Sequence, residues 1–216
     1  MVSFLCAHPD VSGVAGKLLN PDLSLQKIRT SIIGLWPRNY NRVFPVKFVG
    51  SGFHMARASA FKDVGLFDEN YYFYNEDLDW IERANRRGHK FMFLPGARVI
   101  HYSGQGSRQN WPAIERELYR SNIYYYRKFY GPIITFLALT CMKMEIWMKV
   151  RSLRAKLVRA QRSQAPAASG PGGARRGSEV EDIKLAIENL RRAYDAMIYE
   201  YNHGRFLETV DVRRGM

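Results

Sequence analysis

Hydrophobic residues in the first hundred positions fall in short runs that are separated by glycine, proline and asparagine. Such runs predict β-strands, which we expect at residues 14–19, 46–49, 53–56, 91–94 and 98–102. Helical patterns lie between them at residues 58–64 and 77–87, and Gly88 is suited to end the second helix. The pattern therefore predicts an α/β fold, with a short mixed sheet and flanking helices.

Beyond residue 110 the hydrophobic spacing becomes helical. Pro112 suits the first turn of a helix that runs to Tyr130, and Gly131-Pro132 is a natural stop. We expect residues 1–130 to form one domain and residues 131–160 to form an amphipathic basic helix. Residues 161–177 are rich in alanine, glycine, serine and proline, and this composition predicts a disordered linker.

The final segment, residues 178–208, begins with a capping box, Ser178-Glu-Val-Glu181. Apolar residues then alternate at spacings of four and three, at Ile183, Ile187, Leu190, Tyr194, Met197 and Tyr201. This spacing predicts a helix with one apolar stripe, too short for a firm coiled-coil assignment. The stripe could form a homodimer, dock back on the chain or recruit a partner, and the pattern does not choose among these.

The chain has a formal net charge of +13, and much of that charge follows the apolar run at residues 133–142. Seven basic residues come after this run, and Glu145 is the acidic residue among them. The run is shorter than the roughly 20 apolar residues of a membrane-spanning helix. We therefore expect a helix that lies on an anionic membrane surface. A core-packed helix with a solvated basic end is the alternative.

Charge and cysteine usage also bear on partners and location. We expect no nucleic-acid binding, because no recognisable reading module accompanies the basic residues. The two cysteines, Cys6 and Cys141, form neither a metal-binding spacing nor a disulfide framework, and no secretory signal is evident. These features favour a cytoplasmic protein, peripheral on the inner face of the cell membrane.

Three carboxylates, Glu76, Asp77 and Asp79, lie in an aromatic stretch with few other charges. A carboxylate in such surroundings must be paired or put to use, and one with a raised pKa can accept a proton from a hydroxyl group. The alternative is that Asp77 or Asp79 only caps the helix that follows.

The flanking sequence carries a resemblance to a known family. Its parts are Gly50-Ser-Gly52, the strand before Arg57, a Val-Gly-Leu-Phe-Asp-Glu segment, the Glu76-Asp77 pair and a Pro-Gly-Ala-Arg-Val-Ile-His strand that ends at His101. In this order they resemble the acceptor-side half of family 2 inverting glycosyltransferases of the GT-A type, especially the bacterial rhamnosyltransferase-like branch. The resemblance covers about residues 5 to 130.

The resemblance implies roles for individual residues. Asp77 matches the catalytic base, and Glu76 matches a companion that orients the acceptor. Gly50, Gly52, Arg57 and Asp79 fall at positions that imply substrate contact. His101 matches an imidazole that helps to hold a divalent metal, Mg or Mn, beneath the donor diphosphate. A strand histidine that only hydrogen-bonds its neighbours is an equally good interpretation of His101.

The nucleotide-binding half of that family has no counterpart in the sequence, and Asn20-Pro21-Asp22 is better explained as a turn than as a metal motif. We therefore expect an inverting glycosyltransferase acting on a cell-envelope glycan or lipid-linked acceptor. It would use its nucleotide-sugar donor only with the missing half. The alternative is a non-catalytic, membrane-associated fragment or interaction subunit derived from such an enzyme.

Overall fold

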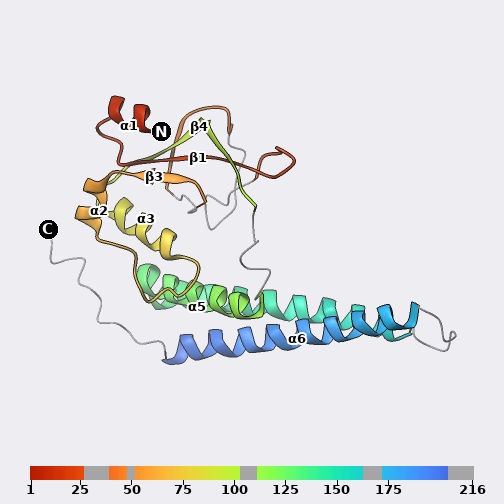
Figure 1. Cartoon of the computed structure of the whole chain (residues 1–216). Helices are drawn as coiled ribbons and strands as arrows, with labels where there is room; N and C mark the ends of the chain where they lie inside the picture. The colour runs from red at the N-terminus through yellow and green to blue at the C-terminus, as the bar shows by residue number, and fades with distance from the viewer. Residues whose placement is uncertain (27–38, 48–51, 103–110, 163–171, 204–216) are drawn as a thin grey trace. The chain divides into compact units, whose positions relative to one another are not determined.

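The computed structural model describes residues 1–26, 39–47, 52–102, 111–162 and 172–203 (Figure 1). The chain divides into two compact units, unit 1 from Met1 to Arg108 and unit 2 from Gln109 to Met216. Residues 109–130, which we expected in the first domain, belong to unit 2.

Unit 1 is built on a four-stranded sheet with the order β2-β4-β1-β3. The strands are β1 (Gly13–Leu19), β2 (Phe44–Val46), β3 (His54–Ala56) and β4 (Phe91–Ile100). β1 is parallel to β4 and antiparallel to β3, while β2 is antiparallel to β4. The sheet is mixed, and with its flanking helices and the long C-terminal helices it confirms the predicted α/β fold class.

β4 is one strand where the sequence predicts two. Its pairing with β1 shifts register between Gly16 and Lys17, so that Gly16 is opposite Leu94 and Lys17 is opposite Arg98. Pro95 has no N–H to donate to the ladder and lies within this irregularity, where proline is tolerated. The strand therefore continues through a proline and a glycine that we took as an interruption.

Helices cover both faces of the sheet. α2 (Ala58–Val64) and α3 (Glu76–Arg86) pack on one face, where Trp80 and Ile81 are almost fully buried with aromatic residues of β4. α1 (Val2–Ala7) covers the other face through Leu5. The alternation of side chains along the strands supplies both cores, because successive residues point to opposite faces.

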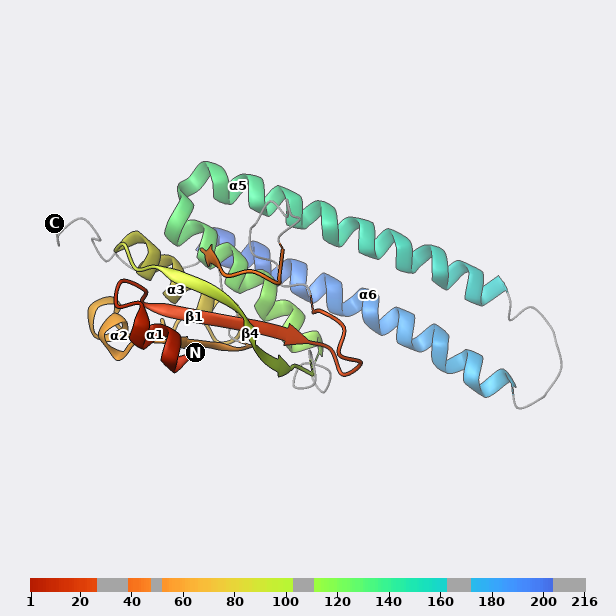
Figure 2. The same cartoon turned by 90° about the horizontal axis from the view of Figure 1, so that it is seen from above.

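Unit 2 consists of α5 (Trp111–Arg162) and α6 (Gly172–His203), which lie side by side in Figures 1 and 2. α5 has a break at Gly131, where φ is 73°, and Pro132 follows it. A left-handed conformation favours glycine, and proline cannot continue the preceding hydrogen-bonding pattern, so this break is the stop that the sequence predicts. α6 begins within the segment that we predicted to be a disordered linker; residues 163–171 lie outside the described residues.

The apolar stripe of the last helix packs within unit 2. One core joins both segments of α5 to α6 and contains Tyr119, Ile123, Leu139, Met142, Ile146, Leu190, Ala193 and Met197. Arg127 of the first α5 segment donates hydrogen bonds to the backbone oxygens of Glu200 and Tyr201, at 2.6 and 3.0 Å. A cation at these carbonyls stabilises the end of α6. Among the described helices, none is long and apolar enough to cross a membrane.

Candidate functional site

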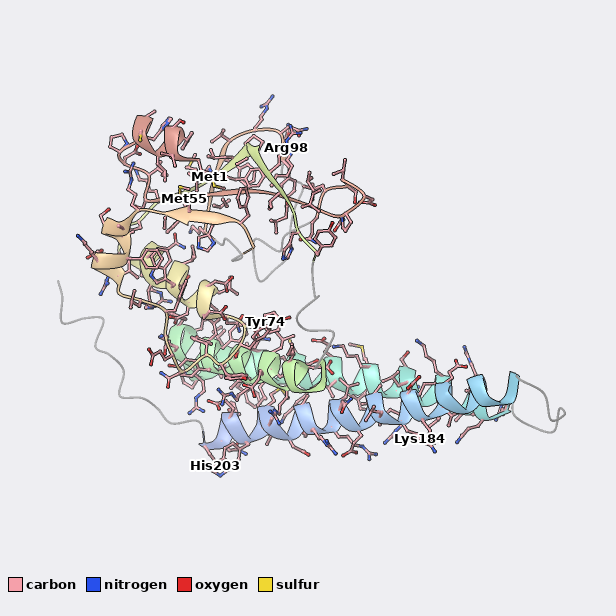
Figure 3. All side chains as sticks on the ribbon, viewed as in Figure 1. Met1, Met55, Tyr74, Arg98, Lys184 and His203 are labelled. Atoms are coloured by element: carbon pink, nitrogen blue, oxygen red, sulfur yellow. The ribbon has the colours of Figure 1, made fainter. Side chains whose placement is uncertain are left out.

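The loop before α3 brings the Glu76-Asp77 pair to the first turn of the helix. Tyr74 and Asn75 both adopt left-handed backbone conformations, with φ of 65° and 69°. Left-handed geometry is costly for a tyrosine, and such strain is concentrated at functional sites. Tyr74 is labelled in Figure 3, at the end of the loop that leads into α3. The chain therefore enters α3 through a constrained turn, and this turn fixes the positions of Glu76 and Asp77.

Glu76 and Asp77 occupy the first two positions of α3 and are half-buried. Oδ1 of Asp77 accepts a hydrogen bond from the backbone N–H of Leu78 at 2.7 Å, which fixes the orientation of this carboxylate. Burial, and to a smaller extent the charge of Asp77, raise the pKa of Glu76, and Oε2 of Glu76 is buried without a hydrogen-bond partner among the described residues. The pair thus combines an oriented carboxylate with one whose pKa is raised by burial.

Asp79 has a different environment from the other two carboxylates. Its side chain is fully buried, and Oδ1 accepts a hydrogen bond from Nε of Arg83 at 2.8 Å. The same guanidinium donates to the backbone oxygens of Val64 and Leu66, at 2.8 and 2.7 Å. Asp79, for which we expected substrate contact, therefore neutralises the arginine that joins α3 to the end of α2.

His54 of β3 belongs to this site, although the sequence analysis did not select it. Its pKa is lowered by burial, while the negative charge of Asp77 acts in the opposite direction. Nδ1 of His54 is buried without a hydrogen-bond partner among the described residues. Ala56, two residues along β3, packs against the core beneath α2 and α3, so His54 points to that same face. The alternation of side chains along β3 could have selected His54. In a strand of only three residues, however, the sequence does not show which residues face the core.

Arg57 has its partners in α1 and in the loop that follows it. The Arg57 guanidinium donates to the backbone oxygens of Val11 and His8, at 2.8 and 3.2 Å, and also to that of Leu5. These contacts tie α1 and its following loop to the start of α2. Gly52 lies beside His101, whose Cε1 would be 3.7 Å from an added Cβ, and Gly50 lies outside the described residues.

His101 follows the end of β4 and prolongs its pairing with β1, because its N–H donates to the backbone oxygen of Leu19 at 2.8 Å. Nδ1 of His101 is 2.7 Å from Oε1 of Gln26. An amide oxygen only accepts, so Nδ1 carries the proton and Nε2 holds the lone pair that a metal would need. Across the described ranges no group of three or more histidine, cysteine or acidic residues could hold a metal ion. His101 can thus supply one ligand, and the others would have to come from outside these residues.

Residues 20–22 form the turn that the sequence predicts. The backbone N–H of Leu23 donates to the oxygen of Asn20 at 2.9 Å, and the N–H of Ser24 donates to Oδ1 of Asp22 at 2.9 Å. Hydrogen bonds from the side chain and backbone of Ser24 lower the pKa of Asp22. The Asp22 carboxylate is therefore used in the turn itself.

Comparison with known proteins gives one partial similarity. The chain is 28% identical over 114 residues to an N-acetylglucosaminyl-diphospho-decaprenol L-rhamnosyltransferase of Mycobacterium tuberculosis, in strains CDC 1551 / Oshkosh and ATCC 25618 / H37Rv. The match covers 48% of this chain and 37% of each relative, so the chain spans little more than a third of their length. No family model and no solved structure matches the chain. The chain thus has a distant, partial similarity to a bacterial rhamnosyltransferase of glycosyltransferase family 2.

Proposed function

We propose that unit 1 is the acceptor side of an inverting glycosyltransferase and that Asp77 is its base. This proposal rests on the different environments of the three carboxylates. Asp79 is committed to Arg83 in the core, while Glu76 and Asp77 are half-buried at the start of α3, and the charge of Asp77 acts on His54 of β3. Partial burial of two carboxylates and a strained loop both lower the stability of the fold. A turn with a purely structural role would require neither of them.

The reaction follows from the chemistry of such a pair. Asp77 takes the proton from an acceptor hydroxyl as that oxygen forms a bond to the anomeric carbon of the donor sugar. The bond from the anomeric carbon to the diphosphate breaks at the same time, and the nucleoside diphosphate leaves with the electron pair. The carboxyl group of Glu76, half-buried next to Asp77, forms a hydrogen bond with the acceptor and orients it.

Aromatic rings beside the carboxylates supply a surface for the acceptor. Tyr72 and Phe73 are exposed on the loop that leads to α3. Aromatic side chains at a binding surface provide rigid apolar contact area with little loss of side-chain entropy. We infer that the acceptor is a glycan or a lipid-linked glycan and that this loop contacts its sugar ring.

We further propose that the nucleotide is held by residues beyond this chain, in a longer protein or in a partner subunit. The match to 37% of the mycobacterial relatives supports this proposal. A divalent metal would stabilise the charge of the leaving diphosphate, and His101 would contribute Nε2 to it. Following the name of that relative, the first donor to test is nucleotide-activated L-rhamnose, and the first acceptor is N-acetylglucosaminyl-diphospho-decaprenol.

A fusion protein provides the test. The part of the mycobacterial relative that the match does not cover is joined to all 216 residues of this chain, and transfer of labelled L-rhamnose is measured. We expect transfer by the fusion and none by either part alone. A folded fusion that binds the nucleotide sugar but transfers to neither this acceptor nor other lipid-linked glycans would contradict the proposal. It would favour the non-catalytic alternative, in which unit 1 serves only as an interaction module.

A further inference from the structure

The second segment of α5 has an apolar face that α6 does not cover. Six large side chains on it have exposed fractions between 53% and 74%: Ile133, Phe136, Leu137, Met144, Trp147 and Met148. Leu139, Met142 and Ile146 of the same segment are buried against α6. The helical period places these two sets on opposite sides of the helix, so the exposed residues form a continuous face of four turns. We call these six residues the apolar face.

The same side of the helix becomes basic immediately after the apolar face. Residues 151–162 contain five basic side chains and no acidic one, and the last acidic residue of α5 is Glu145. Arg151 continues the spacing of Met144 and Met148, and its guanidinium carbon lies 5.3 Å from the Trp147 ring centroid. The helix therefore presents about 24 Å of apolar surface, and Arg151 and Arg154 continue the same side, whereas Lys156 lies about 140° around the helix from Arg151.

Lys149 is not part of this basic surface. Its Nζ donates hydrogen bonds to Glu145 at 2.9 Å and to the Tyr119 hydroxyl at 3.1 Å, and it lies 3.5 Å from Glu115. Burial alone would lower the pKa of Lys149, but these hydrogen bonds outweigh it and raise the pKa. This lysine serves to join the two segments of α5, whereas Arg151 and Arg154 have no acidic residue of α5 within a turn.

A groove with a volume of about 610 Å³ borders the apolar face, between α5 and α6. Trp147, Val150 and Tyr194 form part of its apolar lining. Lys143, Arg154 and Arg191 also line it, against a single carboxylate, Asp195. An apolar groove with an excess of cations suits an acyl chain that carries an anionic head group.

We propose that this side of α5 docks on an anionic phospholipid bilayer. The apolar face and Trp147 enter the boundary between head groups and acyl chains, as tryptophan does at membrane interfaces. Arg151 and Arg154 contact the phosphates, and α6 holds the helix from the opposite side. The sign of the charge selects this occupant, because a second copy of the chain would bring the same basic residues against themselves. The docking does not depend on sugar transfer.

Vesicle sedimentation with the full chain tests this proposal, using phosphatidylcholine vesicles with and without phosphatidylglycerol. We expect strong binding only where phosphatidylglycerol is present. The double variant Arg151→Gln/Arg154→Gln should lower the partition coefficient about 30-fold, since each basic residue near such a surface contributes about fivefold. The control Lys184→Gln/Arg192→Gln removes the same charge from α6, where both residues form only exposed ion pairs, and should leave binding nearly unchanged. Lys184 is labelled in Figure 3.

A second variant tests the apolar contribution separately. Leu137→Ser/Met144→Ser keeps every charge and replaces only exposed side chains, so the helical circular dichroism should stay the same while vesicle binding falls. Equal binding to both kinds of vesicle, or equal losses in the Arg151/Arg154 variant and its control, would overturn the proposal. A dimer in sedimentation equilibrium that this serine variant dissociates would also overturn it and would assign the apolar face to a second copy.

Discussion

The pair formed by Asp79 and Arg83 makes a quantitative prediction about what holds unit 1 together. Asp79 has no exposed surface, the Arg83 side chain is 20% exposed, and Nε and Oδ1 are 2.8 Å apart. Arg83 also donates to the backbone oxygen of Val64, the last residue of α2, and to that of Leu66 in the loop that follows. Replacing Asp79 with asparagine keeps the shape but leaves the guanidinium without its counter-charge. Removing one partner of a buried pair costs about 3–5 kcal/mol.

We expect the lower end of that range, about 3 kcal/mol, because asparagine can still accept one hydrogen bond and Arg83 retains some contact with water. Equilibrium unfolding in urea measures the change, with fluorescence as the signal, since Trp80 is fully buried next to this pair. For a slope of about 1.5 kcal/mol per molar, the midpoint should fall by about 2 M.

The matched control is Glu82→Gln, which removes the ion pair with Arg86 on the same helix at the same i,i+4 spacing. Arg86 is 42% exposed, so this pair should contribute only about 0.3–0.5 kcal/mol. If Asp79→Asn changes the free energy of unfolding by no more than Glu82→Gln does, the assignment of Asp79 to a structural role is wrong.

Three further changes test the packing and the protonation of the site. Gly16→Ala should lower the free energy of unfolding by about 1–3 kcal/mol in urea, because its Cβ would lie 2.3 Å from Cδ1 of Phe53, whereas Gly96→Ala has no atom within 4 Å of the new Cβ and should not. Met197→Ala should cost unit 2 about 2–5 kcal/mol, measured as a lower melting temperature, because this side chain is fully buried between the helices. The pKa of Glu76 is raised by burial, so its contribution to stability is complete below the usual carboxyl pKa and is lost as pH rises through the folded-state value. Glu76→Gln should therefore be more stable than the wild type at pH 7, with the difference shrinking as the pH falls towards 4.5; a difference that grows in acid would reverse the sign of the argument.

The comparison of sequence and structure shows which features local chemistry determines. The stop at Gly131-Pro132 was predictable because both residues act on their own backbone. The strands at β1 and β3 followed from hydrophobic runs. β4 was predicted as two strands because Pro95 and Gly96 usually end a strand, whereas here the neighbouring β1 accommodates them by a change of register. The change of register depends on the pairing of β1 with β4, so the sequence of either strand alone does not predict it.

In the candidate site, too, the sequence predicts the features that depend on neighbouring residues and misses those that depend on tertiary packing. Glu76 and Asp77 could be selected from their sequence because they are adjacent and lie in an ordered set of motifs. Asp79 could not be separated from them, because its complete burial results from the packing of α3 in the core and not from its spacing to Arg83. His54 was missed because it lies on β3, whereas Asp77 lies on α3, more than 20 residues away in the sequence. The docking of the last apolar stripe on α5 likewise depends on tertiary packing.

The turnover of the Asp77→Asn variant tests the central claim most directly. In the fusion with the unmatched part of the mycobacterial relative, we expect kcat for L-rhamnose transfer to fall about 10²–10⁴-fold, the usual contribution of a general base. Binding of the nucleotide sugar should not change, and Asp22→Asn, which alters a carboxylate of the exposed turn, should retain full turnover. A kcat for Asp77→Asn within a factor of two or three of the parent fusion would contradict the assignment of Asp77 as the base.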